Sequence, residues 1–277
     1  MTAGTLAARI AGLLREPPEE PDMSAGYLDL LGPSASPPPT PAQRAMQSAF
    51  LPQIYERVWR PVGFNLAKGW PFGPDTAAEH AMARDRLGLG RPDDIVKPVA
   101  DVLDVACGPG NVTRALAAGV AGDGLVVGLD ASATMLARAA ADTRADAHAG
   151  TRGPDTRGAG AGAAPVGYVR GDAVDLPFRD GTFDAVCCFG ALYLFDDPWT
   201  AVDGMIRVLR PGGNLVILTS RRPLVLPADV GRDLVRRATG LNVFGDGEVT
   251  GALADRGLTG VRRHRYPLMQ LVAARRP

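Results

Sequence analysis

The sequence predicts an α/β protein in which helices cover both faces of a mostly parallel sheet. Short runs rich in Val, Ile and Leu alternate with helix-forming segments, an alternation typical of strands joined by crossover helices. These runs are apolar at nearly every position, as expected for strands that are buried on both faces. The expected strands are residues 101–106, 125–129, 166–170, 184–189 and 213–218, and the expected helices are residues 111–119, 132–145, 197–209 and 227–240.

The C-terminal end breaks this alternation. Residues 259–266 and 268–274 have strand-like patterns, but the chain between them is too short for a crossover helix. They are therefore expected to pair antiparallel, as a hairpin at one edge of the sheet. Residues 146–165, which precede the third strand, are rich in Gly, Ala and Arg and are expected to form a flexible loop.

The first 98 residues differ in composition from the rest of the chain. Residues 16–41 contain proline clusters that are incompatible with a helix or a central strand. A helix is expected after them, with Thr76 as its N-cap and Gly88 or Gly90 near its C-terminal end. The N-terminal segment is thus expected to carry a helical extension of the main domain.

An aromatic cluster lies between the proline-rich segment and this helix. Six aromatic side chains fall within residues 50–72, although aromatic residues make up only 6% of the chain. They predict either a helix packed on the main domain or a cap over the substrate side, in which Tyr55, Trp59 and Trp70 would contact the substrate. The chain is therefore expected to divide into a leader with a helical cap, 1–98, and a main domain, 99–277.

Charge and cysteine content exclude several classes of protein. The formal net charge is zero, so no overall field attracts the chain to nucleic acid or to an anionic membrane. The three cysteines include no CxxC pair, and adjacent Cys187 and Cys188 would point to opposite faces of a strand. The cysteines therefore indicate neither a zinc site nor a disulfide framework. No signal peptide and no run long enough to span a membrane is present, which predicts a cytoplasmic location. The sequence does not determine the oligomeric state.

The stretch VLDVACGPGNVTRA, residues 102–115, is the most informative motif. Gly108 and Gly110 allow a sharp turn after the first strand and bring its backbone close to a ligand. A dinucleotide fingerprint would place Gly or Ala where Thr113 stands, which disfavours that kind of site. A carboxylate at Asp104 suits a ligand with an ammonium group better than a pyrophosphate. The competing interpretation is a buried Asp satisfied by backbone donors.

Two further acidic residues follow the next two strands. Asp130 stands at the tip of the second strand, where a carboxylate accepts hydrogen bonds from ribose hydroxyls. Asp172 stands just past the third strand, beside Ala173, where it would contact adenine or simply form an Asx turn. A ligand with an amino-acid head, a ribose and an adenine but no phosphate is S-adenosylmethionine.

From about residue 99 to 277 the chain resembles the class I S-adenosylmethionine-dependent methyltransferases. Four motifs carry the resemblance in order: VLDVACGPG, VVGLDAS, GDAVDLPF, and FDAVCCFGALYLFDDP leading into RVLRPGG. They are similar to methyltransferase type 11 and to the ubiquinone and menaquinone biosynthesis branch. The resemblance implies a Rossmann-like seven-stranded sheet in the order 3-2-1-4-5-7-6, with the last strand antiparallel.

The resemblance also implies a role for each motif. The first motif would hold the methionyl end of the cofactor, the second the ribose and the third the adenine, and the end of the fourth strand would lie near the sulfonium. The residues implied to bind the cofactor are Asp104, Ala106, Cys107, Gly108, Gly110, Asp130, Ala131, Met135, Asp172, Ala173, Phe189 and Gly190. Tyr193 stands where related enzymes often carry a histidine, and it would orient the acceptor or simply pack.

Methyl transfer from this cofactor is an in-line displacement that requires no metal, and His80, His148 and His264 lie too far apart in the sequence to suggest one. The aromatic cap favours a small, hydrophobic or lipid-like acceptor. From Arg207 onward there are thirteen arginines against five acidic residues, which leaves an anionic acceptor or RNA as an alternative. The sequence also leaves open an NAD-dependent oxidoreductase and a catalytically inactive cofactor-binding module.

Overall fold

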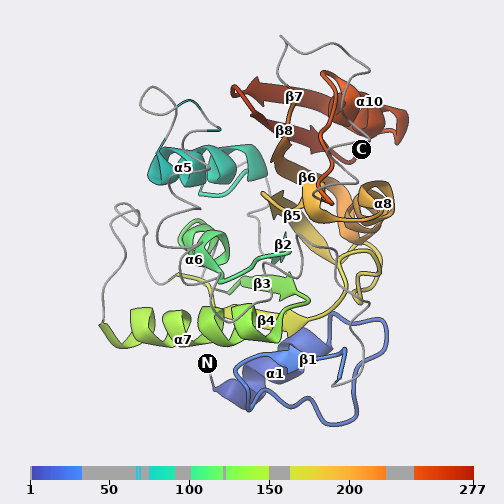
Figure 1. Cartoon of the computed structure of the whole chain (residues 1–277). Coiled ribbons are helices and arrows are strands. Elements are labelled where there is room, and N and C mark those ends of the chain that lie inside the picture. The colour runs from blue at the N-terminus through green and yellow to red at the C-terminus, as the bar shows by residue number, and fades with distance from the viewer. Residues whose placement is uncertain are drawn as a thin grey trace.

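The computed structural model describes residues 2–32, 67, 69, 75–90, 101–120, 123–149, 163–222 and 240–277. Their strands form one sheet of eight strands in the order β1-β4-β3-β2-β5-β6-β8-β7 (Figure 1). The strands are β1 (Leu28–Asp29), β2 (Asp101–Val105), β3 (Leu125–Asp130), β4 (Val166–Arg170), β5 (Phe183–Phe189), β6 (Leu209–Ser220), β7 (Thr259–Arg265) and β8 (Met269–Arg275). The helices are α1 (Ala3–Ala11), α5 (Thr76–Leu87), α6 (Asn111–Ala117), α7 (Ala133–Ala149), α8 (Pro198–Val208) and α10 (Glu248–Asp255), with a 3₁₀ turn at Leu192–Leu194.

The predicted topology is confirmed, with one addition. Strands β1 to β6 pair parallel with their neighbours, whereas β8 runs antiparallel to both β6 and β7. The seven expected strands follow the expected order. The eighth strand, β1, pairs with the outer edge of β4 through Leu28 and Val169. Two residues are too short a run for a sequence pattern to reveal, so this strand was missed.

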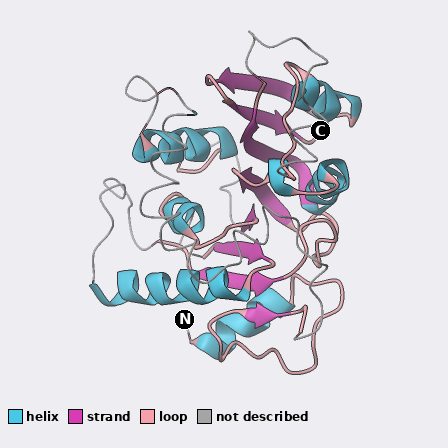
Figure 2. Ribbon diagram, in the orientation of Figure 1, coloured by secondary structure: helices cyan, strands magenta, loops and turns pink. Residues whose placement is uncertain are grey.

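Helices cover both faces of the sheet (Figure 2). Strand residues alternate between the faces, and this alternation decides which helices each side chain meets. Leu103 and Val105 of β2 pack in the cluster that contains residues of α1, α8 and α10, whereas Val102 packs with residues of α5 and α6. Cys187 and Cys188 of β5 divide between the same two clusters, as the sequence predicted.

The N-terminal segment is built into the outer edge of this sheet. Ile10 and Leu14 are buried in the core cluster of β2, β3 and β4. A Cβ atom on Gly167 of β4 would come within 2.5 Å of Ile10 Cδ1, so a side chain there would displace the end of Ile10. The backbone N–H of Arg15 donates to the carbonyl of Pro177 at 2.8 Å. Residues of the leader therefore pack against the β4 side of the sheet.

Two local expectations need correction, and a third is confirmed. The N-cap of α5 is Asp75, whose carboxylate accepts from the Ala78 N–H at 2.8 Å, and not Thr76. Its C-terminal residue is followed by Gly88 in the left-handed conformation, as expected. The helix α7 continues to Ala149, so residues 146–149 are helical where a loop was expected, because alanine-rich chain extends a helix that is already formed.

Some expectations fall outside the described residues. They include the helix at 227–240, apart from its last position, and most of the aromatic cap. The cap over the substrate side and the boundary at residue 98 therefore stay predictions. Among the helices that the structure describes, none has the length and apolar character needed to cross a membrane.

Candidate active site

The predicted motifs meet at the carboxyl ends of the central strands. The chain leaves β2 through the turn at residues 106–110 and enters α6, and Asp130 is the last residue of the neighbouring β3. In an open α/β sheet, the carboxyl ends of the strands form the edge at which ligands bind. The structure therefore brings together the two motifs that the sequence assigned to the methionyl and ribose parts of a cofactor.

The turn after β2 has an unusual backbone. Ala106, with φ 56°, is the one non-glycine residue with positive φ in the described part of the chain. This conformation costs an L-residue about 1–2 kcal/mol, so the surrounding structure must stabilise the turn. Gly108 and Gly110 also have positive φ, at 54° and 74°. At Gly108 a Cβ atom would meet nothing within 4 Å, whereas at Gly110 it would collide with the hydroxyl of Tyr168.

Asp130 ties the two strand ends together. One carboxylate oxygen accepts the Gly108 N–H at 2.8 Å, and the other accepts the Ser132 N–H at 2.8 Å. Burial raises the pKa of this carboxyl, and the hydrogen bonds from Ser132 and Gly108 only partly offset that increase. An ionised carboxylate has about four acceptor positions, so two remain for the hydroxyls of a ligand.

Asp104 is held by the interior of the fold. Its side chain lies on the α6 face of β2 and is 1% exposed. The Thr113 hydroxyl of α6 donates to one oxygen at 2.7 Å, and the Cys187 thiol of β5 lies 3.5 Å from the other. These side-chain donors help to explain a carboxylate within a buried strand. The contact with the cofactor's ammonium group stays a prediction.

Thr113 is a residue whose role the sequence did not reveal. In the sequence it stands out only as a departure from the dinucleotide fingerprint, yet it is fully buried and donates to Asp104. The sequence did contain a signal for this contact. Thr113 follows the buried Asp104 by nine residues, so a strand, a turn and the start of a helix bring its hydroxyl back beside the carboxylate. The threonine at position 113 and the buried Asp104 are thus explained by the same hydrogen bond.

The adenine side of the site is more open. Asp172 is exposed, and its Oδ1 accepts the Val174 N–H at 2.8 Å, which forms an Asx turn. Ala173 and Met135 are buried, whereas Ala131 is exposed and its carbonyl accepts from the guanidinium of Arg170 at 3.1 Å. The Asx turn explains the local role of Asp172, and its contact with adenine stays a prediction.

The acceptor side begins where β5 ends. Phe189 is buried, and Gly190, with φ 71°, donates its N–H to the carbonyl of Leu218 in β6 at 2.8 Å. Tyr193 is half-buried and packs between the two main hydrophobic clusters. The proposed substrate contacts Tyr55, Trp59 and Trp70 lie outside the described residues.

Asn242 is a second residue that the sequence did not single out. Its backbone N–H donates to the Tyr193 carbonyl at 2.8 Å, and its side-chain amide donates to the Phe195 carbonyl at 2.7 Å. The Ser220 hydroxyl, at the end of β6, donates to the Asn242 carbonyl at 2.8 Å. Asn242 therefore fixes the segment after β5 against the end of β6, although it lies 49 positions from Tyr193 in the chain.

Within the described ranges, no group of His, Cys, Asp and Glu side chains is arranged to hold a metal ion. Cys107, Cys187 and Cys188 are free and buried. Burial raises the pKa of each thiol, and the nearby charge of Asp104 raises it further. These cysteines are packed, protonated thiols.

Residues 103–217 match a family model described as a methyltransferase domain. This part of the chain is therefore similar to methyltransferase domains. S-adenosylmethionine is the cofactor that the sequence resemblance implies for it. The second, third and fourth motifs of the sequence resemblance lie within these residues, and the first motif begins at Val102, directly before them.

Similar sequences occur among enzymes named demethylmenaquinone methyltransferase. The enzyme from Bacillus mycoides is 34% identical over 131 residues, which cover 47% of this chain and 49% of that enzyme. The chain thus spans about half the length of the relatives that it matches.

Solved structures share the fold of this chain. The phosphoethanolamine N-methyltransferase 2 of Haemonchus contortus, in complex with S-adenosyl-L-methionine, is 16% identical with a TM-score of 0.56, over 81% of this chain and 59% of that one. The [4+2]-cyclase SpnF is 19% identical with a TM-score of 0.56, over 88% of this chain and 99% of that one. At these identities the likeness shows the fold alone.

Two features of the site fit this cofactor. The side of the turn at Gly108 is open enough that a Cβ atom would meet nothing there, so a ligand can approach the backbone. Asp130 keeps acceptor positions beyond its two hydrogen bonds to backbone N–H groups. These positions are available to hydroxyl groups of a ligand.

Proposed function

We propose that this chain transfers the methyl group of S-adenosylmethionine to a small, hydrophobic or lipid-like acceptor. The observation that carries the proposal is the carboxylate of Asp130, held by the N–H groups of Gly108 and Ser132 at the ligand edge of the sheet. The name of the Bacillus relatives, demethylmenaquinone methyltransferase, supports the acceptor class. The aromatic residues of the leader support the same class.

The residues of the chain would bind and orient the two reactants. Asp130 would accept hydrogen bonds from the ribose, and the turn at residues 106–110 would hold the methionyl end. When bound, the cofactor would supply a methyl group activated by a positively charged sulfur. Phe189 and Gly190 would lie beside that methyl, and Tyr193 would orient the acceptor for in-line attack. Orientation and exclusion of water are what the protein must supply to this reaction.

Cofactor binding is tested by thermal unfolding with S-adenosylhomocysteine and, in parallel, with NAD. A ligand at a hundred times its dissociation constant stabilises the folded state by about 2.7 kcal/mol, which raises the melting temperature by several degrees. S-adenosylhomocysteine alone is expected to do so. A shift with NAD alone would instead support an oxidoreductase.

The site is tested with a matched pair of variants at the two ends of β3. Asp130→Ala removes the acceptor of two ribose hydrogen bonds and is expected to weaken S-adenosylhomocysteine binding about 100-fold. Asp123→Ala removes an exposed carboxylate just before the amino end of β3 and is expected to leave binding unchanged. Equal affinity of Asp130→Ala and the unchanged protein would show that the ribose contact lies elsewhere.

The acceptor class is tested with radioactive methyl transfer to a short-chain demethylmenaquinol. Label is expected in the organic phase, and Asp130→Ala is expected to abolish it. If S-adenosylhomocysteine binds but no label reaches this acceptor or other isoprenoid phenols, the hydrophobic acceptor is wrong and the cofactor assignment remains.

A further inference from the structure

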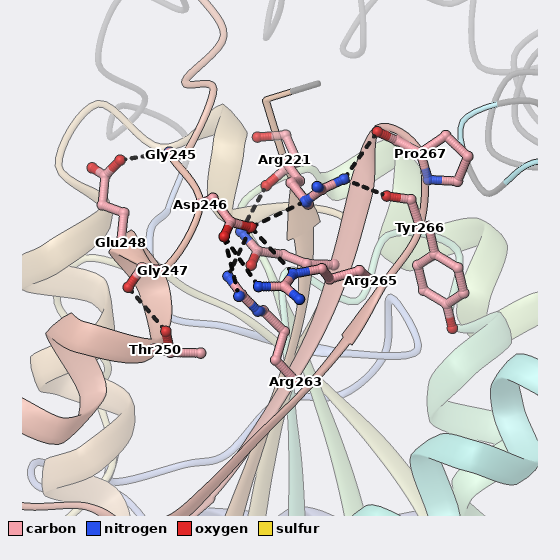
Figure 3. Close-up of polar contacts among 12 residues, drawn as sticks. Arg221, Gly245, Asp246, Gly247, Glu248, Thr250, Arg263, Arg265, Tyr266 and Pro267 are labelled. Atoms are coloured by element: carbon pink, nitrogen blue, oxygen red, sulfur yellow. Dashed lines mark hydrogen bonds and ion pairs between the residues drawn. The ribbon is translucent and has the colours of Figure 1, made fainter. Parts of the chain in front are cut away.

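Three arginine side chains converge on one carboxylate beyond the carboxyl end of β6 (Figure 3). Arg221 follows β6, Arg263 and Arg265 belong to β7, and Asp246 lies just before α10. Nε of Arg221 lies 3.3 Å from Asp246 Oδ1, and Nη2 of Arg263 lies 3.3 Å from Oδ2. Arg265 holds both oxygens, at 3.2 and 3.1 Å. We call Arg221, Arg263 and Arg265 the arginine cluster.

The arginine cluster carries more positive charge than its carboxylate can balance. Three guanidinium groups against Asp246 leave an excess of two positive charges. Hydrogen bonds from Arg265 and Arg221 and the charge of Arg263 outweigh the effect of burial and lower the pKa of Asp246. The aspartate is therefore ionised at neutral pH, the arginines are always charged, and the excess persists.

The arginine cluster differs from two other ion-pair clusters of the described residues. In each of those, the salt bridges join two arginines to two aspartates, one cluster lying beside β2 and the other between α6 and α7. The members of these two clusters are Arg9, Arg210, Asp101 and Asp184, and Arg114, Arg138, Asp142 and Asp146.

Two side chains of the arginine cluster are largely buried and held in place, and the third is exposed to solvent. The side chain of Arg221 is 6% exposed, and its Nη1 also donates to the carbonyls of Tyr266 and Pro267 at 3.0 and 3.3 Å. Arg263 is 14% exposed, and its buried Nη1 makes no hydrogen bond in the described part of the chain, although it lies 3.1 Å from Asp246 Oδ1. Arg265 is 53% exposed, so a ligand can reach its guanidinium from solvent.

We propose that the arginine cluster binds the phosphate group of a ligand. Guanidinium groups match phosphate oxygens with paired, charge-assisted hydrogen bonds, and a phosphate dianion would balance the two excess charges. Arg221 is held in place by its backbone partners, so the site is preformed. It lies at the edge of the sheet where the strands end, and it does not depend on the proposed methyl transfer. The phosphate belongs either to a free phosphorylated molecule or to a phospholipid headgroup.

The test compares two arginines on opposite faces of the same strand. Arg265→Gln removes one guanidinium from the cluster, whereas Arg262→Gln removes the same charge from the exposed, opposite face of β7. The probe for a free phosphate is inorganic pyrophosphate, measured by calorimetry at low ionic strength. The probe for a headgroup is a phosphatidylcholine vesicle that contains phosphatidic acid, measured by flotation against pure phosphatidylcholine.

Binding to at least one probe is expected, weakened about tenfold by Arg265→Gln and unchanged by Arg262→Gln. Pyrophosphate binding identifies a free phosphorylated ligand, and binding to vesicles alone identifies the headgroup. The proposal is overturned if neither probe binds, or if Arg262→Gln weakens binding as much as Arg265→Gln. Affinity for S-adenosylhomocysteine is measured on the same variants and is expected to stay unchanged, which shows that both are folded.

Discussion

The contact between Thr113 and Asp104 gives the sharpest test of how the centre of this fold is held together. Thr113→Val keeps the shape of the side chain and removes the hydroxyl that donates to Asp104 Oδ2 at 2.7 Å. Thr113 is 0% exposed and Asp104 is 1% exposed, so water cannot replace the lost donor without opening the core. A hydrogen bond to a buried charged group contributes about 1.5–3 kcal/mol. The free energy of unfolding is therefore expected to fall by about 2 kcal/mol.

The measurement is urea unfolding at pH 7, followed by circular dichroism. Thr134→Val, an exposed substitution of the same type in α7, is the control and is expected to stay within about 0.5 kcal/mol of the unchanged protein. In the Asp104→Asn background, Thr113→Val is expected to cost less, because the hydroxyl no longer faces a charge. A cost below about 0.5 kcal/mol for Thr113→Val itself would refute the view that this hydroxyl stabilises the buried carboxylate.

Three further outcomes follow from the same region. Gly110→Ala is expected to destabilise the protein strongly, because its φ of 74° disfavours a side chain and a Cβ atom would collide with Tyr168; an unchanged melting temperature would contradict this. Because the pKa of Asp130 is raised above 3.8 in the folded state, folding stability is expected to fall as pH rises from 3.8 through the folded-state pKa. Urea unfolding across that range should show the fall, and Asp130→Ala should remove it. The three cysteines are expected not to react with a thiol reagent until denaturant is added; reaction in the folded state would refute their burial.

The order and type of the central elements were determined by local sequence. Alternating apolar runs and helix-forming segments predicted five parallel strands and the helices between them, because each pattern depends on residues close together in the chain. The same reasoning placed Cys187 and Cys188 on opposite faces. It also located the glycine turn and Asp130, since a strand end and the turn that follows are neighbours in sequence.

The tertiary structure decided which distant side chains meet. Nothing local links Asn242 to Tyr193, or Asp246 to three arginines on two other segments, because such contacts depend on how the strands are ordered in the sheet. Even Asp104 was predicted to face a ligand, and only the packing of α6 on β2 showed that Thr113 holds it. The sequence by itself determined the glycine turn and the strand ends at which a ligand is predicted to bind, because these features are local. The folded chain determined which charged side chains of the arginine cluster meet, because such contacts depend on neighbours in space.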